Sequence, residues 1–364
     1  MKLPRLIVVS AGLGLSGGGS AALGRLVVAC AQEHSAAAGV RFSVMHLGPA
    51  NEIVAGSSVR HFDGNQKAMA AALFAAQCVG ARPAIIFDHL GPARVQAYLP
   101  AGLRSRYAVF LLGVEVARPL SWDRRRALRG AAIPLAISEH TRALALQNAP
   151  GVASVAVLHP ALEERAPAGA KDEALLTKAG DGFLLIVGRM AASERYKGHD
   201  LLIETLARLT PLRETRLVIA GAGDDRARLE ARAGELGLAA RALFAGFVSE
   251  ATLAELYARA RAFVMPSSGE GFGLVYLEAM RAGKPCVALA GGAAEEIVVD
   301  GETGLLVDGS PDALAAALAA LVRDPALAAR LGAAGRRRFD ERFRREHFRA
   351  QLAVQLDRLL DRSA

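Results

Sequence analysis

The chain has few of the features that mark secreted, disulfide-stabilised or membrane-spanning proteins. It contains only three cysteines, Cys30, Cys78 and Cys286, and their odd number and wide spacing fit neither a disulfide framework nor a CxxC metal site. No apolar run approaches the roughly 18 residues that a membrane-spanning helix needs. The first ten residues begin like a secretion signal, but glycines interrupt the pattern at 12–19. We therefore predict that the first ten residues form a buried strand. These absences favour a cytoplasmic protein with reduced thiols.

Excess negative charge is also absent, and the positive charge is unevenly distributed. Of 44 basic and 36 acidic side chains, 17 and 9 lie in residues 1–165, which leaves 27 of each for the rest of the chain. A basic first half predicts an anionic partner such as a lipid phosphate or a membrane surface. Nucleic acid is disfavoured because no alternation of aromatic and basic residues and no DNA-binding motif occurs. The alternative is a basic surface that serves only solubility.

Length and composition indicate two globular domains of the α/β class. The chain is 52% hydrophobic and 22% charged, which is typical of a soluble protein. Its 364 residues are too many for one core. Short apolar runs alternate with helical patterns along the whole chain, which predicts parallel sheets covered by helices. We expect one domain over residues 1–165, a polar linker over 163–181 and a second domain over 166–342. A final amphipathic helix follows in 343–364.

A glycine loop near the start of the chain raises the possibility of dinucleotide binding. Gly12, Gly14 and Gly17 match G-x-G-x-x-G between an expected strand and an expected helix. A dinucleotide site also needs an acidic residue after the second strand to hold the ribose, and this chain has His46-Leu47-Gly48-Pro49 there. The absence of that residue argues against NAD. No Gly-Lys-Ser/Thr sequence follows the glycines, so the loop is not a P-loop.

The stretch on which the functional interpretation depends lies between two apolar runs, 262–266 and 285–289. Three glycines (269, 271 and 273) predict a sharp turn, and a helix that begins near Gly273 would direct its positive end toward an anion. Glu270 and Glu278 are eight residues apart, so both carboxylates could border one cavity at different depths. The alternative is an ordinary strand-turn-helix unit in which Glu278 is solvated.

This pattern, two glutamates separated by seven residues with Gly271-Phe272-Gly273 between them, resembles the Glu-x7-Glu signature of retaining glycosyltransferases of family four. The resemblance implies the GT-B fold, in which two Rossmann-like domains face a cleft. It also implies that the donor binds the second domain, that the acceptor binds the first, and that the helix in 343–364 returns to the first domain.

The resemblance assigns roles in the second domain. Glu270 is expected on the hydroxyls of the donor sugar, Glu278 on the ribose, and the backbone amides of the glycine turn beside the diphosphate. Arg189 and Lys197, each next to a glycine, resemble the basic pair that neutralises the diphosphate leaving group; alternatively, they are surface cations. The remaining expected contacts are Phe247 and Val248 at the nucleobase, Gly271, Phe272, Gly273 and Leu274 in the glycine turn, and Gly291 and Gly292 on the phosphate side.

In the first domain the resemblance is weaker. Gly17-Gly18-Gly19 resembles a Gly-Gly element near the donor phosphates, which makes Gly18 and Gly19 candidate contacts. Many family members have a histidine that lines the acceptor side, and this chain has Leu112 at that position. We therefore expect His89 or Glu115 to take its place, although His89 could simply cap the loop before Gly91. Ser138 and Thr141 resemble the family's Ser-x-x-Thr segment, which should border the cleft.

The sequence therefore predicts a metal-independent retaining transferase. It would move a hexose-type sugar from a UDP- or GDP-linked donor to a glycan or lipid-linked acceptor, in the synthesis of cell-surface polysaccharide or glycoconjugates. No Asp-x-Asp occurs anywhere in the chain, and no metal or other cofactor is expected. Four arginines crowd residues 122–129 beside Asp123, which suggests binding to the inner face of a membrane.

Two other functions remain open at this point. An epimerase or hydrolase that acts on nucleotide sugars could share the two-domain layout, but it would need additional acid and base groups. Only Asp88, His89 and Glu115 are available for that role. A non-catalytic partner of another transferase, which binds a sugar nucleotide, would be consistent with the missing histidine at position 112.

Overall fold

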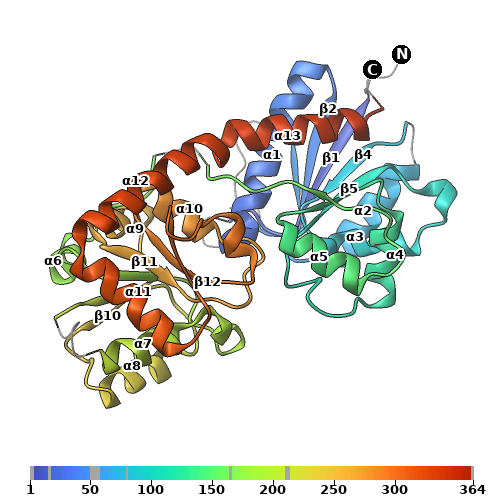
Figure 1. Cartoon of the computed structure of the whole chain (residues 1–364). Coiled ribbons are helices and arrows are strands. Elements are labelled where there is room, and N and C mark those ends of the chain that lie inside the picture. The colour runs from blue at the N-terminus through green and yellow to red at the C-terminus, as the bar shows by residue number, and fades with distance from the viewer. Residues whose placement is uncertain are drawn as a thin grey trace. The chain divides into compact units, whose positions relative to one another are not determined.

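The computed structural model describes residues 4–14, 18–49, 58–78, 81–163, 166–209 and 214–361. The chain divides into two compact units. The first unit holds the residues up to Glu163 together with the chain from Arg344 onward, and the second holds Glu164–Phe343. Each unit is built on one parallel sheet with helices on both faces (Figure 1), which confirms the expected α/β class.

The first unit contains a seven-stranded parallel sheet in the order β3-β2-β1-β4-β5-β6-β7. Its strands are β1 Arg5–Ser10, β2 Arg41–His46, β3 Val59–His61, β4 Ala84–Phe87, β5 Tyr107–Leu111, β6 Ile133–Ala136 and β7 Ala156–Val157. Its helices are α1 Gly18–Ala38, α2 Gln66–Cys78, α3 Leu90–Ala93, α4 Trp122–Gly130, α5 Glu139–Asn148 and α13 Arg345–Leu359, with 3-10 turns at Arg94–Tyr98 and Ala101–Leu103.

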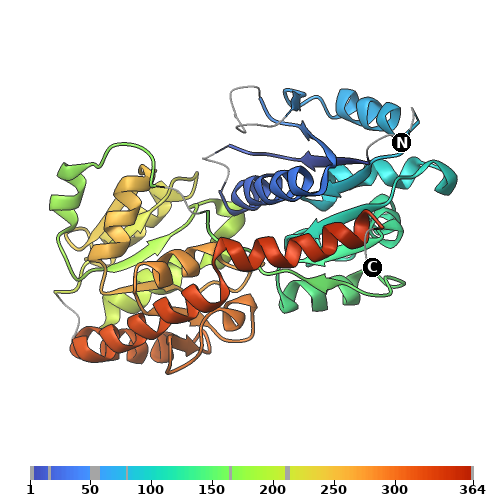
Figure 2. The same ribbon diagram turned by 90° about the horizontal axis from the view of Figure 1, so that it is seen from above.

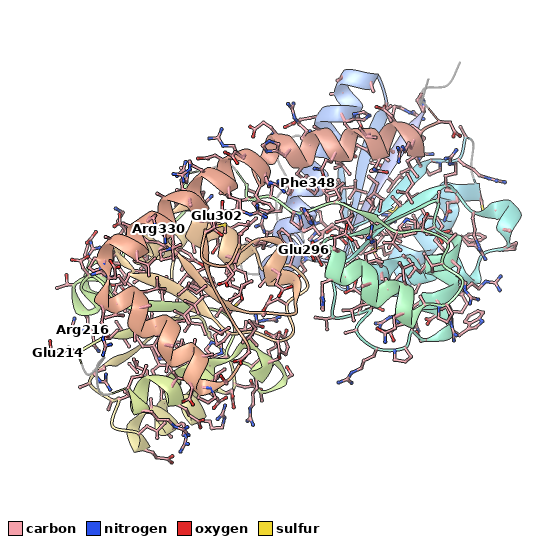
Figure 3. All side chains as sticks on the ribbon, in the orientation of Figure 1. Glu214, Arg216, Glu296, Glu302, Arg330 and Phe348 are labelled. Atoms are coloured by element: carbon pink, nitrogen blue, oxygen red, sulfur yellow. The ribbon has the colours of Figure 1, made fainter. Side chains whose placement is uncertain are left out.

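The strands of this sheet are apolar on both faces because helices cover both sides, as is usual for parallel sheets. Ile7 and Val9 of β1 belong to the core formed with α2, α3, α4 and α5. On the opposite face, Phe110 of β5 stacks on Phe348 of α13 with ring centroids 6.5 Å apart. Phe348 is labelled in Figure 3. Helix α13 lies beside α1 (Figures 1 and 2), so the last helix completes the core of the first unit.

The second unit contains a six-stranded parallel sheet in the order β10-β9-β8-β11-β12-β13. Its strands are β8 Leu184–Val187, β9 Leu217–Ala220, β10 Ala242–Gly246, β11 Ala262–Met265, β12 Cys286–Leu289 and β13 Gly304–Val307. Its helices are α6 Glu173–Ala179, α7 His199–Arg208, α8 Arg226–Glu235, α9 Glu250–Arg259, α10 Leu274–Arg281, α11 Pro311–Arg323 and α12 Pro325–Arg342, with 3-10 turns η3 Ala192–Lys197 and η5 Ala293–Glu296. Helix α7 packs beside α11, and α10 packs beside α12.

The expected linker over 163–181 is wrong in its second half, where the chain forms helix α6. Asp172 caps this helix by accepting a hydrogen bond from the Leu175 amide at 2.9 Å, and Leu176 is fully buried. The polar composition of the stretch concealed a short helix held by one cap and one buried leucine. Helix α9, which was not predicted from the sequence, begins with a similar cap at Ser249. None of the helices in the described part of the chain is both long and apolar enough to span a membrane.

Glycine at position 332 allows α12 to pack closely on the turn that follows α10. A Cβ atom at Gly332 would lie 2.1 Å from the carbonyl oxygen of Gly283. We therefore expect Gly332→Ala to lower the free energy of unfolding by about 1–3 kcal/mol or more, because neither backbone can move away easily. Urea denaturation of the wild type and the variant checks this.

The matched control for this prediction is Gly234→Ala. Gly234 lies in α8, and outside its chain neighbours and its own helix backbone a Cβ atom there would meet no atom within 4 Å. This change should raise the stability by about 0.5–1 kcal/mol because alanine favours the helix. If Gly332→Ala proved as stable as Gly234→Ala, the close packing of α12 would be refuted.

Candidate functional site

The turn between β11 and α10 has the geometry that its glycines predicted. Helix α10 begins at Leu274, and Gly273 precedes it with a φ of +102°, a conformation that favours glycine. A Cβ atom at Gly273 would also lie 2.5 Å from the ring of Tyr276. Both constraints select glycine at this position. The prediction that the helix starts near Gly273 is confirmed.

Glu270 lies in this turn and is largely buried. Its Oε1 atom lies 3.5 Å from the Ser267 hydroxyl and 3.8 Å from Nζ of Lys197. Burial raises the pKa of Glu270, and the positive charge of Lys197 opposes that shift. The ring of Tyr196 packs so closely on Gly269 that a Cβ atom there would lie 2.7 Å from it. The sequence singled out Glu270 and Lys197 separately, and the fold brings them together.

Glu194 joins the two predicted cations, and sequence reasoning missed it. Its Oε1 atom lies 2.5 Å from Nη2 of Arg189, and its Oε2 atom lies 3.3 Å from Nζ of Lys197. The side chains of Glu194 and Lys197 are each 15% exposed, whereas that of Arg189 is 74% exposed. We call Arg189, Glu194, Lys197 and Glu270 the charged quartet; it contains two cations and two carboxylates. The one feature of the sequence that could have pointed to Glu194 was an acidic residue placed between the two expected cations.

The segment that carries three members of the quartet is anchored on both sides. The Met190 amide donates to the Ala222 carbonyl at 3.0 Å, and the Ser268 amide donates to the Tyr196 carbonyl at 3.0 Å. Arg195 makes two hydrogen bonds to Asp225, at 2.9 and 3.1 Å. The loops that follow β8, β9 and β11 are therefore bonded to one another at the carboxyl ends of neighbouring strands.

Asp225 holds the base of this arrangement. It accepts hydrogen bonds from Arg228 as well as Arg195, and these interactions hold its pKa well below the usual range. His199, which follows the anchored segment, is buried, and burial lowers its pKa to about 4, with a further contribution from Lys197. His199 is therefore neutral at physiological pH.

Glu278 lies at the start of the second turn of α10 and makes a different contact. Its Oε2 atom accepts a hydrogen bond of 2.9 Å from the hydroxyl of Tyr257 on α9. Burial raises the pKa of Glu278, and the Tyr257 hydrogen bond opposes that shift. Glu278 is half-buried and hydrogen-bonded, so it is not the freely solvated side chain of the alternative considered above. That Glu270 and Glu278 line one cavity remains a prediction.

Other expected contacts of the second unit lie at strand ends. Phe247 follows β10, and its side chain is 72% exposed. Val248 is half-buried. The Gly291 amide donates to Oε1 of Glu295 at 2.6 Å, in the loop after β12. Among the residues that the structure describes, no group of three or more His, Cys, Asp or Glu side chains could hold a metal ion.

The glycine loop of the first unit differs from expectation at its end. Gly18 and Gly19 are the first residues of helix α1 and not part of the loop, while Gly17 lies outside the described residues. The positive φ of Gly18, +68°, allows the chain to turn into the helix there. Gly24, which the sequence did not single out, lets α1 approach β4, since a Cβ atom there would lie 2.8 Å from Oδ2 of Asp88.

His89 and Glu115, predicted as alternatives, lie close together. Nε2 of His89 is 3.8 Å from Oε2 of Glu115, and the other carboxylate oxygen accepts a hydrogen bond of 3.0 Å from the Leu112 amide. Nδ1 of His89 accepts from the Gly91 amide at 2.9 Å, so His89 caps the short helix α3. The capping interpretation is confirmed, and the cap places the ring proton on Nε2, facing Glu115.

Ser138 caps helix α5 as the sequence predicted. Its hydroxyl oxygen accepts a hydrogen bond of 2.9 Å from the Thr141 amide. Ser138 and Thr141 are both buried. That this segment borders a cleft remains a prediction.

Asp88 is buried beside Ser10 at the carboxyl ends of β4 and β1. Oδ2 of Asp88 lies 2.5 Å from the Ser10 hydroxyl, which is also 3.2 Å from the Gly12 carbonyl oxygen. Burial raises the pKa of Asp88 to about 7, and the charge of Glu115 adds to the shift. A protonated Asp88 can donate to Ser10 while Ser10 donates to Gly12. The neutral carboxyl therefore satisfies all three groups.

This raised pKa predicts how stability depends on pH. Asp88 ionises near 3.8 in an unfolded chain but only near 7 in the folded protein, so between these values the folded state binds more protons. The contribution of Asp88 to the free energy of unfolding should fall as the pH rises from about 4 to about 7. Asp88→Asn preserves the hydrogen-bonding shape and removes the ionisation.

Thermal unfolding from pH 5 to pH 8 checks the prediction. We expect the wild type to lose stability relative to Asp88→Asn across this range, by about 1 kcal/mol or more, which corresponds to roughly 2–4 °C per kcal/mol. Parallel pH profiles of the two proteins would show that Asp88 does not titrate as described.

Comparison with known proteins places this site in context. Residues 170–338 match the family model described as glycosyl transferases group 1. The structure is similar to Anabaena Alr3699/HepE in complex with UDP and glucose (TM-score 0.79, 20% identity, 98% of this chain and 100% of that chain). It is also similar to sucrose-phosphate synthase from Thermosynechococcus elongatus (TM-score 0.78, 23% identity, 99% and 100% covered). These similarities show the GT-B fold.

The two sequence relatives described here each match less than half of the chain. A GDP-mannose-dependent alpha-(1-6)-phosphatidylinositol monomannoside mannosyltransferase of Mycolicibacterium smegmatis is 40% identical over 149 residues, which are 38% of this chain and 39% of the relative. A D-inositol 3-phosphate glycosyltransferase of Xylanimonas cellulosilytica is 39% identical over 165 residues, which are 44% and 38% of the two chains. The matches thus span less than half the length of these curated relatives.

Proposed function

We propose that the chain is a retaining hexosyltransferase, from the premise that residues 170–338 match the family model described as glycosyl transferases group 1. It would transfer a sugar from a UDP- or GDP-linked donor to a glycan or lipid-linked acceptor, in the synthesis of cell-surface polysaccharide or glycoconjugates. The observation that carries the proposal is the charged quartet. It combines two cations with Glu270, whose Oε1 atom is 3.8 Å from Nζ of Lys197.

The chemistry of sugar transfer explains why such a group is needed. Breaking the bond between the sugar and the diphosphate leaves negative charge on the leaving group, and fixed cations stabilise that charge in the transition state. We assign this role to Arg189 and Lys197, with the amides of the glycine turn beside the diphosphate. Glu270 would accept hydrogen bonds from the sugar hydroxyls, and Glu278 from the ribose.

The choice of donor rests on the relatives. One structural neighbour binds UDP and glucose, and one sequence relative is named as dependent on GDP-mannose. We therefore propose UDP or GDP as the leaving group, with Phe247 and Val248 beside the base. Because two cations would do the work of a bound metal, the transfer should proceed without one.

The acceptor is assigned to the first unit. His89 and Glu115 would stand where many family members have a histidine, because Leu112 cannot form hydrogen bonds through its side chain. Their 3.8 Å separation leaves room for a hydroxyl oxygen to accept from Nε2 of His89 and to donate to Glu115. Gly18 and Gly19 would lie near the donor phosphates.

Lys197→Ala and Glu278→Gln test the assigned donor site. Each change removes one charge from a largely buried position, so we expect the rate of sugar transfer to fall by about 10² or more. The measurement is mass spectrometry of products from a panel of UDP- and GDP-sugars. Lys178→Ala, on the exposed part of α6, is the matched control and should keep wild-type activity.

The same assay separates the proposed function from its rivals. Transfer should continue in EDTA, and the product should keep the anomeric configuration of the donor, as read by NMR. Loss of activity in EDTA with rescue by Mn²⁺ would contradict independence from metals. Donor hydrolysis or epimerisation without transfer would favour those activities, and near wild-type turnover of both folded variants would refute the assigned site.

We also propose that the first unit binds an anionic membrane surface from the cytoplasmic side, where a lipid-linked acceptor would lie. Trp122 of α4 and Tyr98 are 56% and 67% exposed, and their rings are in contact at 5.6 Å. Arg126 lies 5.6 Å above the Trp122 ring. Asp123, expected to offset the arginines of its own helix, instead pairs with Arg94 at 2.5 Å. Exposed aromatic rings beside arginines suit a membrane interface.

Trp122 is the chain's single tryptophan, so its fluorescence reports this contact directly. We expect a blue shift with vesicles that contain phosphatidylglycerol, none with neutral phosphatidylcholine, and loss of the shift at high salt. Replacing the four arginines of α4 by glutamine should weaken vesicle binding while a short soluble acceptor is still glycosylated. The four arginines are Arg124, Arg125, Arg126 and Arg129. The control replaces four exposed arginines of the second unit, Arg323, Arg330, Arg337 and Arg342. Equal vesicle binding by both variants would refute the proposal.

A further inference from the structure

Glu194 has no role in the function proposed so far, although it touches both cations of the charged quartet. Its position is fixed rather than accidental, since the neighbouring residues are bonded to another loop. The Ala192 amide donates to Asp224 at 2.9 Å, and Arg195 pairs with Asp225. The Glu194 amide also donates to the Ala191 carbonyl at 2.8 Å. The fold therefore holds this carboxylate between Arg189 and Lys197.

The position of Glu194 changes the charge that a phosphate group would meet. With Glu194 and Glu270 ionised, the two cations are balanced and the quartet has no net charge. Removing the Glu194 charge would leave one net positive charge. Because Glu194 and Lys197 are largely buried, their charges are screened less than charges on an open surface. A carboxylate at this point competes with any phosphate oxygen for the same two cations.

This competition does not act equally on donor and product. A free nucleoside diphosphate ends in a phosphate that ionises a second time near neutral pH, whereas the sugar ester in the donor has no such terminal group. The product therefore carries more negative charge than the donor beside Glu194. Repulsion from this carboxylate weakens the binding of product more than that of donor.

We propose that Glu194 is a positioning residue that holds Arg189 and Lys197 in place and keeps them from retaining the nucleoside diphosphate after transfer. This inference rests on the proposed function, because it assumes that the two cations bind a diphosphate. It adds that the site is balanced for release of product as well as for capture of donor.

The test is the affinity of Glu194→Gln for UDP and GDP, measured by titration calorimetry. Glutamine keeps the shape of the side chain and removes its charge. We expect about tenfold tighter binding of the diphosphate that the wild type binds, an effect of the size of one nearby charge. The gain should be smaller for the monophosphate, negligible for the nucleoside, and reduced at high salt. In steady state the inhibition constant of the product should fall more than the KM of the donor.

Two variants control for structural effects. Glu194→Asp retains the charge and should bind the diphosphate within about threefold of the wild type. Glu230→Gln removes a glutamate that pairs with Arg226 at 2.7 Å on α8, and it should leave diphosphate affinity unchanged. If Glu194→Gln is unstable, Glu194→Ala tests the same loss of charge.

The outcomes distinguish this inference from the proposed function. Diphosphate binding by the wild type, with equal or weaker binding by Glu194→Gln, would overturn the role of Glu194 alone. If the wild type bound neither UDP nor GDP, the proposed donor site would fail, and this inference would fail with it.

Discussion

The charged quartet depends on the parallel pairing of β8 with its neighbours β9 and β11. Parallel strands place all their carboxyl ends on one edge of a sheet, so the loops after these three strands meet there. Glycines make the contact close: a Cβ atom at Gly221 would lie 2.0 Å from the Gly188 carbonyl oxygen, and one at Gly198 would lie 2.3 Å from that of Pro266. Side chains at these positions would push the loops apart and separate the cations from Glu270.

Burial and charge are balanced within this group. Burial alone would favour a protonated Glu270, and the nearby Lys197 opposes that effect. Tyr196 lies beside these charges, and burial together with the negative charge of Glu270 raises the pKa of its hydroxyl to about 12. The tyrosine therefore stays neutral and supplies packing against Gly269 without adding a third negative charge. Glu278 is stabilised separately by Tyr257, away from the cations.

The first unit follows the same rule with different chemistry. Its polar residues also gather at the carboxyl ends of neighbouring strands, since Ser10 ends β1, Asp88 follows β4 and Glu115 lies in the loop after β5. In the part of the chain that the structure describes, the contacts of Ser10, Asp88 and Glu115 include no lysine or arginine, and burial favours a neutral Asp88. This difference accompanies the proposal that an acceptor hydroxyl binds beside His89 and Glu115 and that the diphosphate binds the charged quartet.

The sequence by itself determined the α/β class, the strand and helix of the central turn, and the identities of Glu270, Arg189 and Lys197 as candidates. The class and the turn could be predicted because glycine and apolar periodicity act locally along the chain. The roles of the three charged residues followed from the resemblance of their motifs to those of a known family. Only the tertiary structure decided that Glu194 bridges the two cations, that Tyr257 holds Glu278, and that His89 meets Glu115. Each of these pairings joins side chains whose separation depends on loop conformation or strand order, which local pattern does not specify. Helix α6 was missed for a related reason. The tertiary packing of its buried Leu176 stabilises it, and the polar composition of the segment does not reveal that packing.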